Sequence, residues 1–256
     1  MTNILLTLSY DGSDFCGWQI QKSPPQTRTV QGCLEEALEK MLKQHVNIQG
    51  SGRTDSGVHA RAQAANFFSP YDNIECENYI RALNGLLPKD IRISNAEKKD
   101  SSFSSRFSAT SRSYRYFIQT KNPPLARDSR YVWYIPHQPD AEKLNLMSQI
   151  LLGEKDFATF TAAGDKSLST KRYVEKAHWW YEREDLLVFE IEANAFLWKM
   201  VRSITGTLIG CEKNNFSVQD FKNLFESCQR KNAGFTAPPD GLFLWQVKFD
   251  GIRRHV

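Results

Sequence analysis

The order in which strand-like and helix-like segments follow one another is the feature that most constrains the fold of this chain. In residues 1–107, short apolar runs alternate with two segments whose apolar residues recur at helical spacing. The expected elements are strands at 4–10, 46–49, 63–68 and 91–93, and helices at 30–42 and 79–87, with Thr29 as the N-cap of the first helix. The resulting order β-α-β-β-α-β is typical of a ferredoxin-like unit.

The rest of the chain repeats this order with one helix added. It predicts strands at 114–118, 173–181, 186–192 and 242–249, helices at 144–151, 195–211 and from 217, and a loop at 153–170. We therefore predict an α/β (α+β) fold of two ferredoxin-like domains, residues 1–107 and 108–256. Their mixed and antiparallel sheets are expected to join, with a central active-site cleft between the domains.

Composition narrows the class of protein. The chain has 256 residues, of which 41% are hydrophobic and 24% charged, and its net charge is +4. These values predict a folded protein and permit a nucleic-acid partner without requiring one. No two of the five cysteines have the close spacing of a zinc or redox site. The apolar run at 4–8 is too short for a signal peptide or a membrane span, so we expect a cytoplasmic protein without a metal site.

Two loops in the first half of the chain are candidate functional segments. A long loop marked by Pro24-Pro25 is expected after the first strand, and loops of this length inside a domain are often functional. Residues 52–60 read Gly-Arg-Thr-Asp-Ser-Gly-Val-His-Ala. They could form an ordinary surface turn, in which Asp55 bonds its own backbone, and composition alone favours that interpretation. Alternatively, the glycines present Asp55 to a ligand, with Arg53 contacting phosphate or holding the turn.

The expected helix at 195–211 has a clear apolar face. At about 100° per residue its apolar side chains fall within one arc, and Arg202 lies outside that arc with Trp198 beside it one turn earlier. Arg202 is then either solvated or directed at a polar site.

Residues 52–60 resemble the signature of the tRNA pseudouridine synthase A family, in which the aspartate is catalytic. The resemblance assigns that role to Asp55. Residues 196–202, Phe-Leu-Trp-Lys-Met-Val-Arg, resemble a family motif whose arginine pairs with the catalytic aspartate, which implies this role for Arg202. A guanidinium there would keep the carboxylate ionised and oriented.

Substrate contacts follow from two further matches. Residues 112–116, Arg-Ser-Tyr-Arg-Tyr, resemble the family motif whose first tyrosine stacks on the target base, here Tyr114. Leu244, in Gly-Leu-Phe-Leu, resembles the apolar residue that lines the pocket opposite that tyrosine. Without the resemblance, each would be read as an ordinary half-buried strand residue or core residue.

The resemblance extends along nearly the whole chain. Residues 11–19, 29–31, 153–157 and 237–242 also resemble family motifs, in the family's order. The sequence departs from the family pattern at Trp198, Ser104, Ser203 and Lys155, which bears on tRNA contacts and site choice.

The resemblance implies a reaction and its partners. The family isomerises uridine to pseudouridine in the anticodon stem-loop of tRNA, at tRNA positions 38, 39 and 40, and works as a homodimer. The reaction needs neither a redox step nor phosphoryl transfer, so no cofactor is implied. Asp55 could attack C1′ of the sugar, attack C6 of the base, or take the C2′ proton. Phosphate contacts from basic residues would make binding salt-sensitive, and the candidates are Arg53, Arg61, Arg106, Arg112 and Arg115.

Three other interpretations stay open at this point. The chain could be a non-catalytic tRNA-binding module, a pseudouridine synthase with altered site choice, or a metabolite-binding α/β protein. The joint presence of Asp55, Tyr114 and Arg202 argues against a decayed site. His59 could act as a general base, but a single histidine without a visible partner is more often structural.

Overall fold

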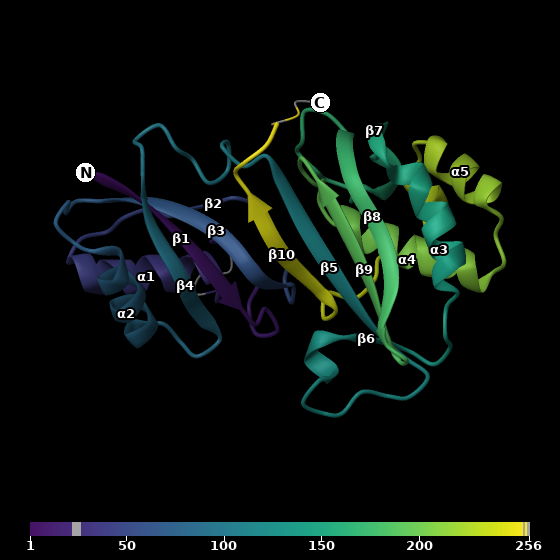
Figure 1. Cartoon of the computed structure of the whole chain (residues 1–256), viewed down its shortest axis with the longest axis horizontal. Coiled ribbons are helices and arrows are strands. Elements are labelled where there is room, and N and C mark those ends of the chain that lie inside the picture. The colour runs from purple at the N-terminus through teal and green to yellow at the C-terminus, as the bar shows by residue number, and fades with distance from the viewer. Residues whose placement is uncertain (22–26, 253, 255–256) are drawn as a thin grey trace. The chain divides into compact units, whose positions relative to one another are not determined.

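The structure is a computed structural model that describes residues 1–21, 27–252 and 254. Pro24 and Pro25, which marked the expected long loop, lie outside the described residues. The chain forms two compact units (Figure 1). Unit 1 contains residues 1–110 and 243–251, and unit 2 contains residues 111–242 and 252–256.

Unit 1 has the predicted order β-α-β-β-α-β, completed by a strand from the far end of the chain. Its strands pair in the order β4-β1-β3-β10, and β2 pairs with β3. All of these pairs are antiparallel except β10 with β3, so the sheet is mixed. The elements are β1 (Thr2–Tyr10), α1 (Val30–Leu42), β2 (Gln49–Gly50), β3 (His59–Ser69), α2 (Cys76–Leu86), β4 (Ile91–Lys99) and β10 (Leu242–Lys248).

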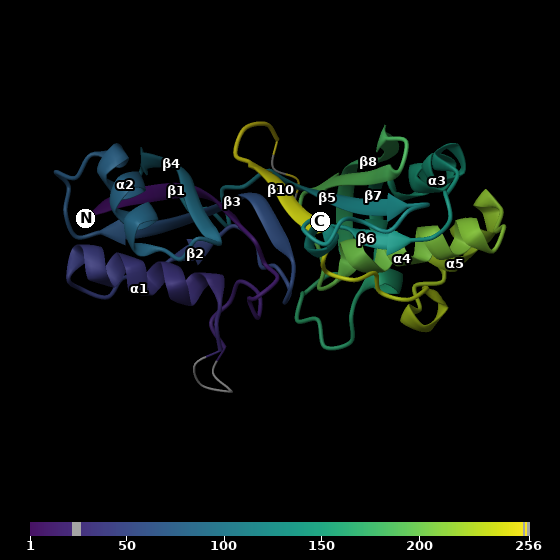
Figure 2. The ribbon, with the colours of Figure 1, turned by 90° about the horizontal axis from the view of Figure 1, so that it is seen from below.

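The first helix of unit 1 is specified locally and then held by burial. The hydroxyl of Thr29 accepts a hydrogen bond from the Gly32 N–H, which confirms the expected N-cap. One face of α1 is buried, and the helix runs along one face of the strands (Figure 2). The helix α2, predicted at 79–87, begins three residues earlier at Cys76 and ends at Leu86, two residues before Pro88.

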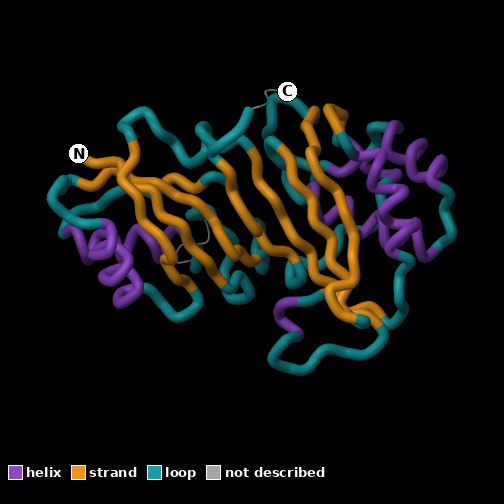
Figure 3. The backbone as a smooth tube through the Cα atoms, in the orientation of Figure 1, coloured by secondary structure: helices purple, strands orange, loops and turns teal. Residues whose placement is uncertain are grey.

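Unit 2 is built around an antiparallel set of strands in the order β5-β9-β8-β7, with β6 parallel to β5 (Figure 3). All eight residues of β9 are buried. The elements are β5 (Ser111–Thr120), β6 (Trp133–Ile135), α3 (Ala141–Ser148), β7 (Gly153–Asp156), β8 (Lys171–Arg183), β9 (Leu186–Ala193), α4 (Met200–Lys213) and α5 (Val218–Glu226), with 3-10 turns at 129–131, 149–151, 158–160 and 230–232.

The α/β class is confirmed, and several element bounds differ from the sequence prediction. The strand expected at 46–49 is reduced to Gln49–Gly50, the loop expected at 153–170 contains β7, and β6 was not predicted. The compact units also differ from the predicted division, because β10 pairs with β3 and thereby places residues 243–251 in unit 1. The joining of the sheets and the cleft between the domains stay predictions.

The helix predicted at 195–211 was wrong at its start. The helix α4 begins at Met200, and Lys199 has a left-handed φ of 60°, which a continuous right-handed helix cannot include. Trp198 therefore does not lie on a helical face, and the wheel that placed it beside Arg202 does not apply. No helix among residues 1–21, 27–252 and 254 is long and apolar enough to cross a membrane.

Candidate active site

Asp55 lies on the connection between β2 and β3, where the sequence predicted the glycine-bracketed loop. Its side chain is partly exposed, whereas its neighbour Thr54 is buried. The Thr54 hydroxyl is 2.8 Å from the Tyr10 hydroxyl at the end of β1, and the Val58 N–H donates to the Asp55 carbonyl. The loop therefore turns tightly, and Thr54, the residue before Asp55, attaches it to the end of β1.

The segment of residues 11–19 holds this loop from the other side. The Trp18 N–H donates to the Thr54 carbonyl at 3.1 Å, and the Phe15 carbonyl accepts from the Gly57 N–H and the Ser56 hydroxyl, each at 3.2 Å. Gly17, with φ +88°, passes so close that a Cβ there would lie 2.6 Å from the Thr54 carbonyl oxygen. Only glycine permits both that backbone angle and that approach.

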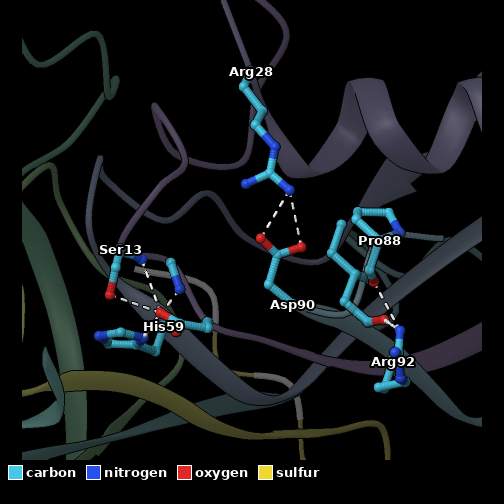
Figure 4. A network of polar contacts seen from close by, with 9 residues as sticks. Ser13, Arg28, His59, Pro88, Asp90 and Arg92 are labelled. Atoms are coloured by element: carbon cyan, nitrogen blue, oxygen red, sulfur yellow. Dashed lines mark hydrogen bonds and ion pairs between the residues drawn. The ribbon is translucent and has the colours of Figure 1, made fainter. Parts of the chain in front are cut away.

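An ion pair anchors the segment 11–19 in turn (Figure 4). The Arg28 guanidinium contacts the two oxygens of Asp90 at 2.8 and 3.0 Å. The same guanidinium lies 3.9 Å from the centroid of the Phe15 ring. The Asp90 carbonyl also accepts a hydrogen bond from the Asp11 N–H. Asp90 therefore binds both Arg28 and Asp11, the first residue of the segment 11–19.

His59, considered as a general base, is fully buried. Its Nδ1 accepts from the Gly12 N–H at 3.0 Å and lies 3.3 Å from an oxygen of Asp11 (Figure 4). Its ring stacks on Phe243 of β10 at a centroid distance of 4.6 Å. That oxygen of Asp11 also accepts from the backbone and hydroxyl of Ser13. With these contacts, His59 is a buried structural residue that fixes the start of β3.

Leu244 of β10 belongs to unit 1, although it is far from Asp55 along the chain. It pairs with Ala60 in the parallel register of β10 with β3, and its side chain is fully buried. Of the arginines proposed to contact phosphate, Arg53 is exposed on the Asp55 loop itself. Arg61 and Arg106 are also exposed, and their guanidinium groups lie over Trp245 and Phe107 at 4.8 and 5.3 Å.

Tyr114 lies on β5 of unit 2, opposite Ile191 of β9. Its side chain is only 8% exposed, and the Phe196 ring meets it edge-on at 4.9 Å with an interplanar angle of 80°. The position is that of a fixed aromatic ring in a largely buried environment.

The neighbouring arginines of β5 are occupied within unit 2. Arg112 is buried and donates to the Asn194 carbonyl at 2.9 Å. Arg115 pairs with Glu190 at 2.9 Å. Burial alone would raise the pKa of Glu190, but its bonds to Lys176 and Arg115 outweigh this and lower it. These two arginines are less available for phosphate than Arg53.

Arg202 lies in the first turn of α4 and is held by the segment that precedes β10. Its Nε donates to the Ala237 carbonyl at 2.8 Å, and the Ala237 N–H donates back to the Arg202 carbonyl at 3.1 Å. Nearby, the buried Tyr116 hydroxyl donates to the Pro238 carbonyl at 2.6 Å. Burial raises the pKa of Tyr116 well above its usual value, although Arg202 opposes this shift.

Each unit thus brings some of the predicted residues together. Unit 1 holds Asp55 and Arg53 on one loop and Leu244 on β10, opposite Ala60 of β3, and unit 2 holds Tyr114 and Arg202. The anchoring roles of Arg28 and Asp90 were not predicted from the sequence. The available signal was the unusual length of the loop before the first helix.

Comparison with known proteins gives the family. A family model described as tRNA pseudouridine synthase matches residues 7–108 and 147–250. Among individual relatives, tRNA pseudouridine synthase A of Treponema denticola is 51% identical to this chain, and the match covers 96% of this chain and 92% of that protein. The protein of that name from Treponema pallidum is 47% identical over 90% and 83%, and that from Caldicellulosiruptor bescii is 39% identical over 97% and 100%. The chain therefore belongs to the tRNA pseudouridine synthase family.

Proposed function

We propose that the chain isomerises uridine to pseudouridine in the anticodon stem-loop of tRNA, with Asp55 as its catalytic carboxylate. Its family and its relatives' names support the enzymatic reaction on tRNA. In that reaction the bond between C1′ and N1 breaks and a bond between C1′ and C5 forms. C5 loses its hydrogen as a proton and N1 gains one, so the reaction is redox-neutral and needs no cofactor.

The observation that carries the role of Asp55 is the way its loop is held. Backbone bonds from Phe15 and Trp18 fix the loop on both sides of Asp55, while the carboxylate stays partly exposed. A catalytic group held on a rigid support loses little orientational freedom in the reaction. A carboxylate is also a plausible nucleophile or base for glycosyl chemistry. Attack at C1′, attack at C6 and removal of the C2′ proton all require this arrangement.

The other site residues are proposed to act around Asp55. Arg202, anchored by Ala237, would pair with the carboxylate and keep it ionised. Tyr114 would stack on the flipped uracil, with Leu244 lining the pocket. Arg53 would contact the adjacent RNA backbone, because it is exposed on the loop of Asp55. We also propose a cytoplasmic homodimer in which one tRNA contacts both subunits.

The first test measures tritium release from tRNA labelled at C5 of uracil. C5 loses its hydrogen only when it becomes the glycosidic carbon, so release reports the isomerisation directly. We expect release by the wild-type chain and none by Asp55→Asn, which preserves the size of the side chain and removes its charge.

The controls separate catalysis from binding and folding. The unfolding midpoint and the tRNA affinity of Asp55→Asn should match those of the wild type. Release by the variant at the wild-type rate would refute the role of Asp55. If neither protein released tritium but both bound tRNA, the chain would instead be a tRNA-binding module.

A further inference from the structure

Trp198 is a large aromatic side chain that the proposed reaction does not use. It is 45% exposed, although it lies between the buried residues Leu197 and Met200. It belongs to the segment 194–199, which connects β9 to α4. A singly exposed ring is ordinary on a protein surface, so a role for Trp198 depends on how the ring is held and on the charge near it.

The backbone of Trp198 is fixed at both of its polar groups. Its N–H donates to a carboxylate oxygen of Asp165 at 2.5 Å, and its carbonyl accepts from the Ala162 N–H at 3.0 Å. Asp165 is itself fixed by the Ser167 N–H at 2.7 Å. The loop passes beside the indole, since a Cβ built on Gly164 would lie 3.7 Å from Trp198 Cζ3. Hydrogen bonds therefore fix the backbone that carries the exposed ring.

The next residue adds a strained backbone and a positive charge. Lys199 has a φ of 60°, which is unfavourable for a residue with a side chain and persists where the surrounding structure imposes it. Its ammonium group lies 5.0 Å from the centroid of the Trp198 ring. The strain thus accompanies a pairing of an aromatic ring with a cation.

The charge of the two segments that meet at Trp198 favours an anionic partner. The segments 161–172 and 194–202 together contain five basic residues and one acidic residue. The acidic residue, Asp165, is already bonded to the backbone of Trp198 and Ser167. The basic residues are Lys166, Lys171, Arg172, Lys199 and Arg202. Arg172 is buried and donates to the Ser169 and Lys171 carbonyls, and Arg202 is proposed to pair with Asp55, so the three lysines are the cations that count for this surface. An aromatic ring with a surplus of cations is the combination that binds single-stranded nucleic acid.

The same segment also reaches the proposed base site of unit 2. Phe196, two residues before Trp198, packs edge-on against Tyr114. One short segment therefore carries an inner ring against Tyr114 and an outer ring exposed at the surface.

We propose that Trp198 stacks on a nucleotide base of the tRNA that flanks the reacting uridine, and that Lys199 contacts a phosphate beside it. This inference rests on the proposed function, since Tyr114 is taken to hold the reacting base. Stacking on an indole tolerates any base, so Trp198 contributes affinity and positioning with little base specificity.

The test measures tRNA affinity in the Asp55→Asn background, where no turnover interferes. Trp198→Ala should weaken binding about tenfold, and Trp198→Phe should retain most of the affinity because it keeps a flat ring. The dependence of affinity on salt should separate the two contacts. Trp198→Ala should leave the salt slope unchanged, whereas Lys199→Gln should reduce it by about one phosphate contact.

Phe216→Ala is the matched control, because Phe216 is also exposed (37%) and lies in the same unit. It should leave affinity unchanged. Equal affinity of Trp198→Ala and its parent would overturn the proposal, as would a parent that binds no tRNA. Dissociation of a dimer by Trp198→Ala in sedimentation would assign the ring to a second copy of the chain and would also overturn it. Tritium release by the wild type tests the catalytic proposal separately, so weakened binding by Trp198→Ala without any release would support stacking alone.

Discussion

At the scale of single residues, Gly17 shows how tightly the loop of Asp55 is enclosed. A side chain at Gly17 would meet two difficulties, a φ of +88° and a contact of 2.6 Å with the Thr54 carbonyl oxygen. Gly17→Ala should therefore destabilise the fold by more than the roughly 1–2 kcal/mol of the backbone angle alone. It should also lower kcat, because relief of the contact displaces the residue next to Asp55. Urea unfolding and tritium release measure the two effects.

Gly153→Ala provides the control for Gly17. Gly153 has nearly the same φ, +85°, but nothing lies within 4 Å of a Cβ built there. This variant should carry the cost of the backbone angle and keep the wild-type kcat. If both variants lost activity equally, the close approach at Gly17 would not be what positions Asp55.

At the scale of elements, the pair Arg28–Asp90 connects the segment before α1 to the segment before β4. The guanidinium also lies over Phe15, whose carbonyl holds the loop of Asp55. We expect Arg28→Ala to lower kcat about tenfold or more while changing KM for tRNA little, since a misplaced catalytic group loses rate before affinity. Steady-state tritium release checks this, and Arg28→Lys should recover part of the rate.

Lys121→Ala is the comparison for this pair. Lys121 and Glu184 form an ion pair of the same length, 2.8 Å, in unit 2. Exposed pairs of this kind contribute about 0–1 kcal/mol. The variant should retain both kcat and stability. A kcat for Arg28→Ala as high as that of Lys121→Ala would show that Arg28 has no positioning role.

At the scale of the whole molecule, unit 1 is assembled from the two ends of the chain. The strand β10 pairs with β3, Leu244 is fully buried, and the Lys248 carbonyl accepts from the Thr110 N–H at 2.9 Å. We expect residues 1–110 alone to be markedly less stable than a chain in which residues 243–251 follow them through a flexible linker. Loss of β10 would leave an edge of β3 and an apolar surface uncovered. Urea unfolding followed by circular dichroism compares the two.

The same linker carrying residues 243–251 with Leu244→Ala tests whether the strand itself is responsible. Removing a fully buried leucine side chain costs about 2–5 kcal/mol, so the chain with Leu244→Ala should lose most of the stability that residues 243–251 add. Equal stability of all three chains would mean that β10 is only attached to unit 1 and does not stabilise it.

The features that depend on local chemistry could be predicted from the sequence. Thr29 caps α1 because a hydroxyl at that position can accept a hydrogen bond from an unpaired N–H, and the helix predicted from 217 begins there with a capping box of Ser217 and Asp220. The pattern of apolar residues predicted the order of elements in unit 1, and the Asp55 motif indicated the family.

The remaining features depend on contacts between residues that are distant in the sequence. The helical pattern before Met200 was overridden by bonds of Trp198 to the loop at 162–165, and the closing strand joined unit 1 because β3 offered it an edge. Arg28 and Asp90 are far apart in sequence, and only folding brings a guanidinium to a carboxylate and a ring at once. Periodicity and propensity report on neighbours along the chain, whereas these arrangements depend on groups that meet only through space.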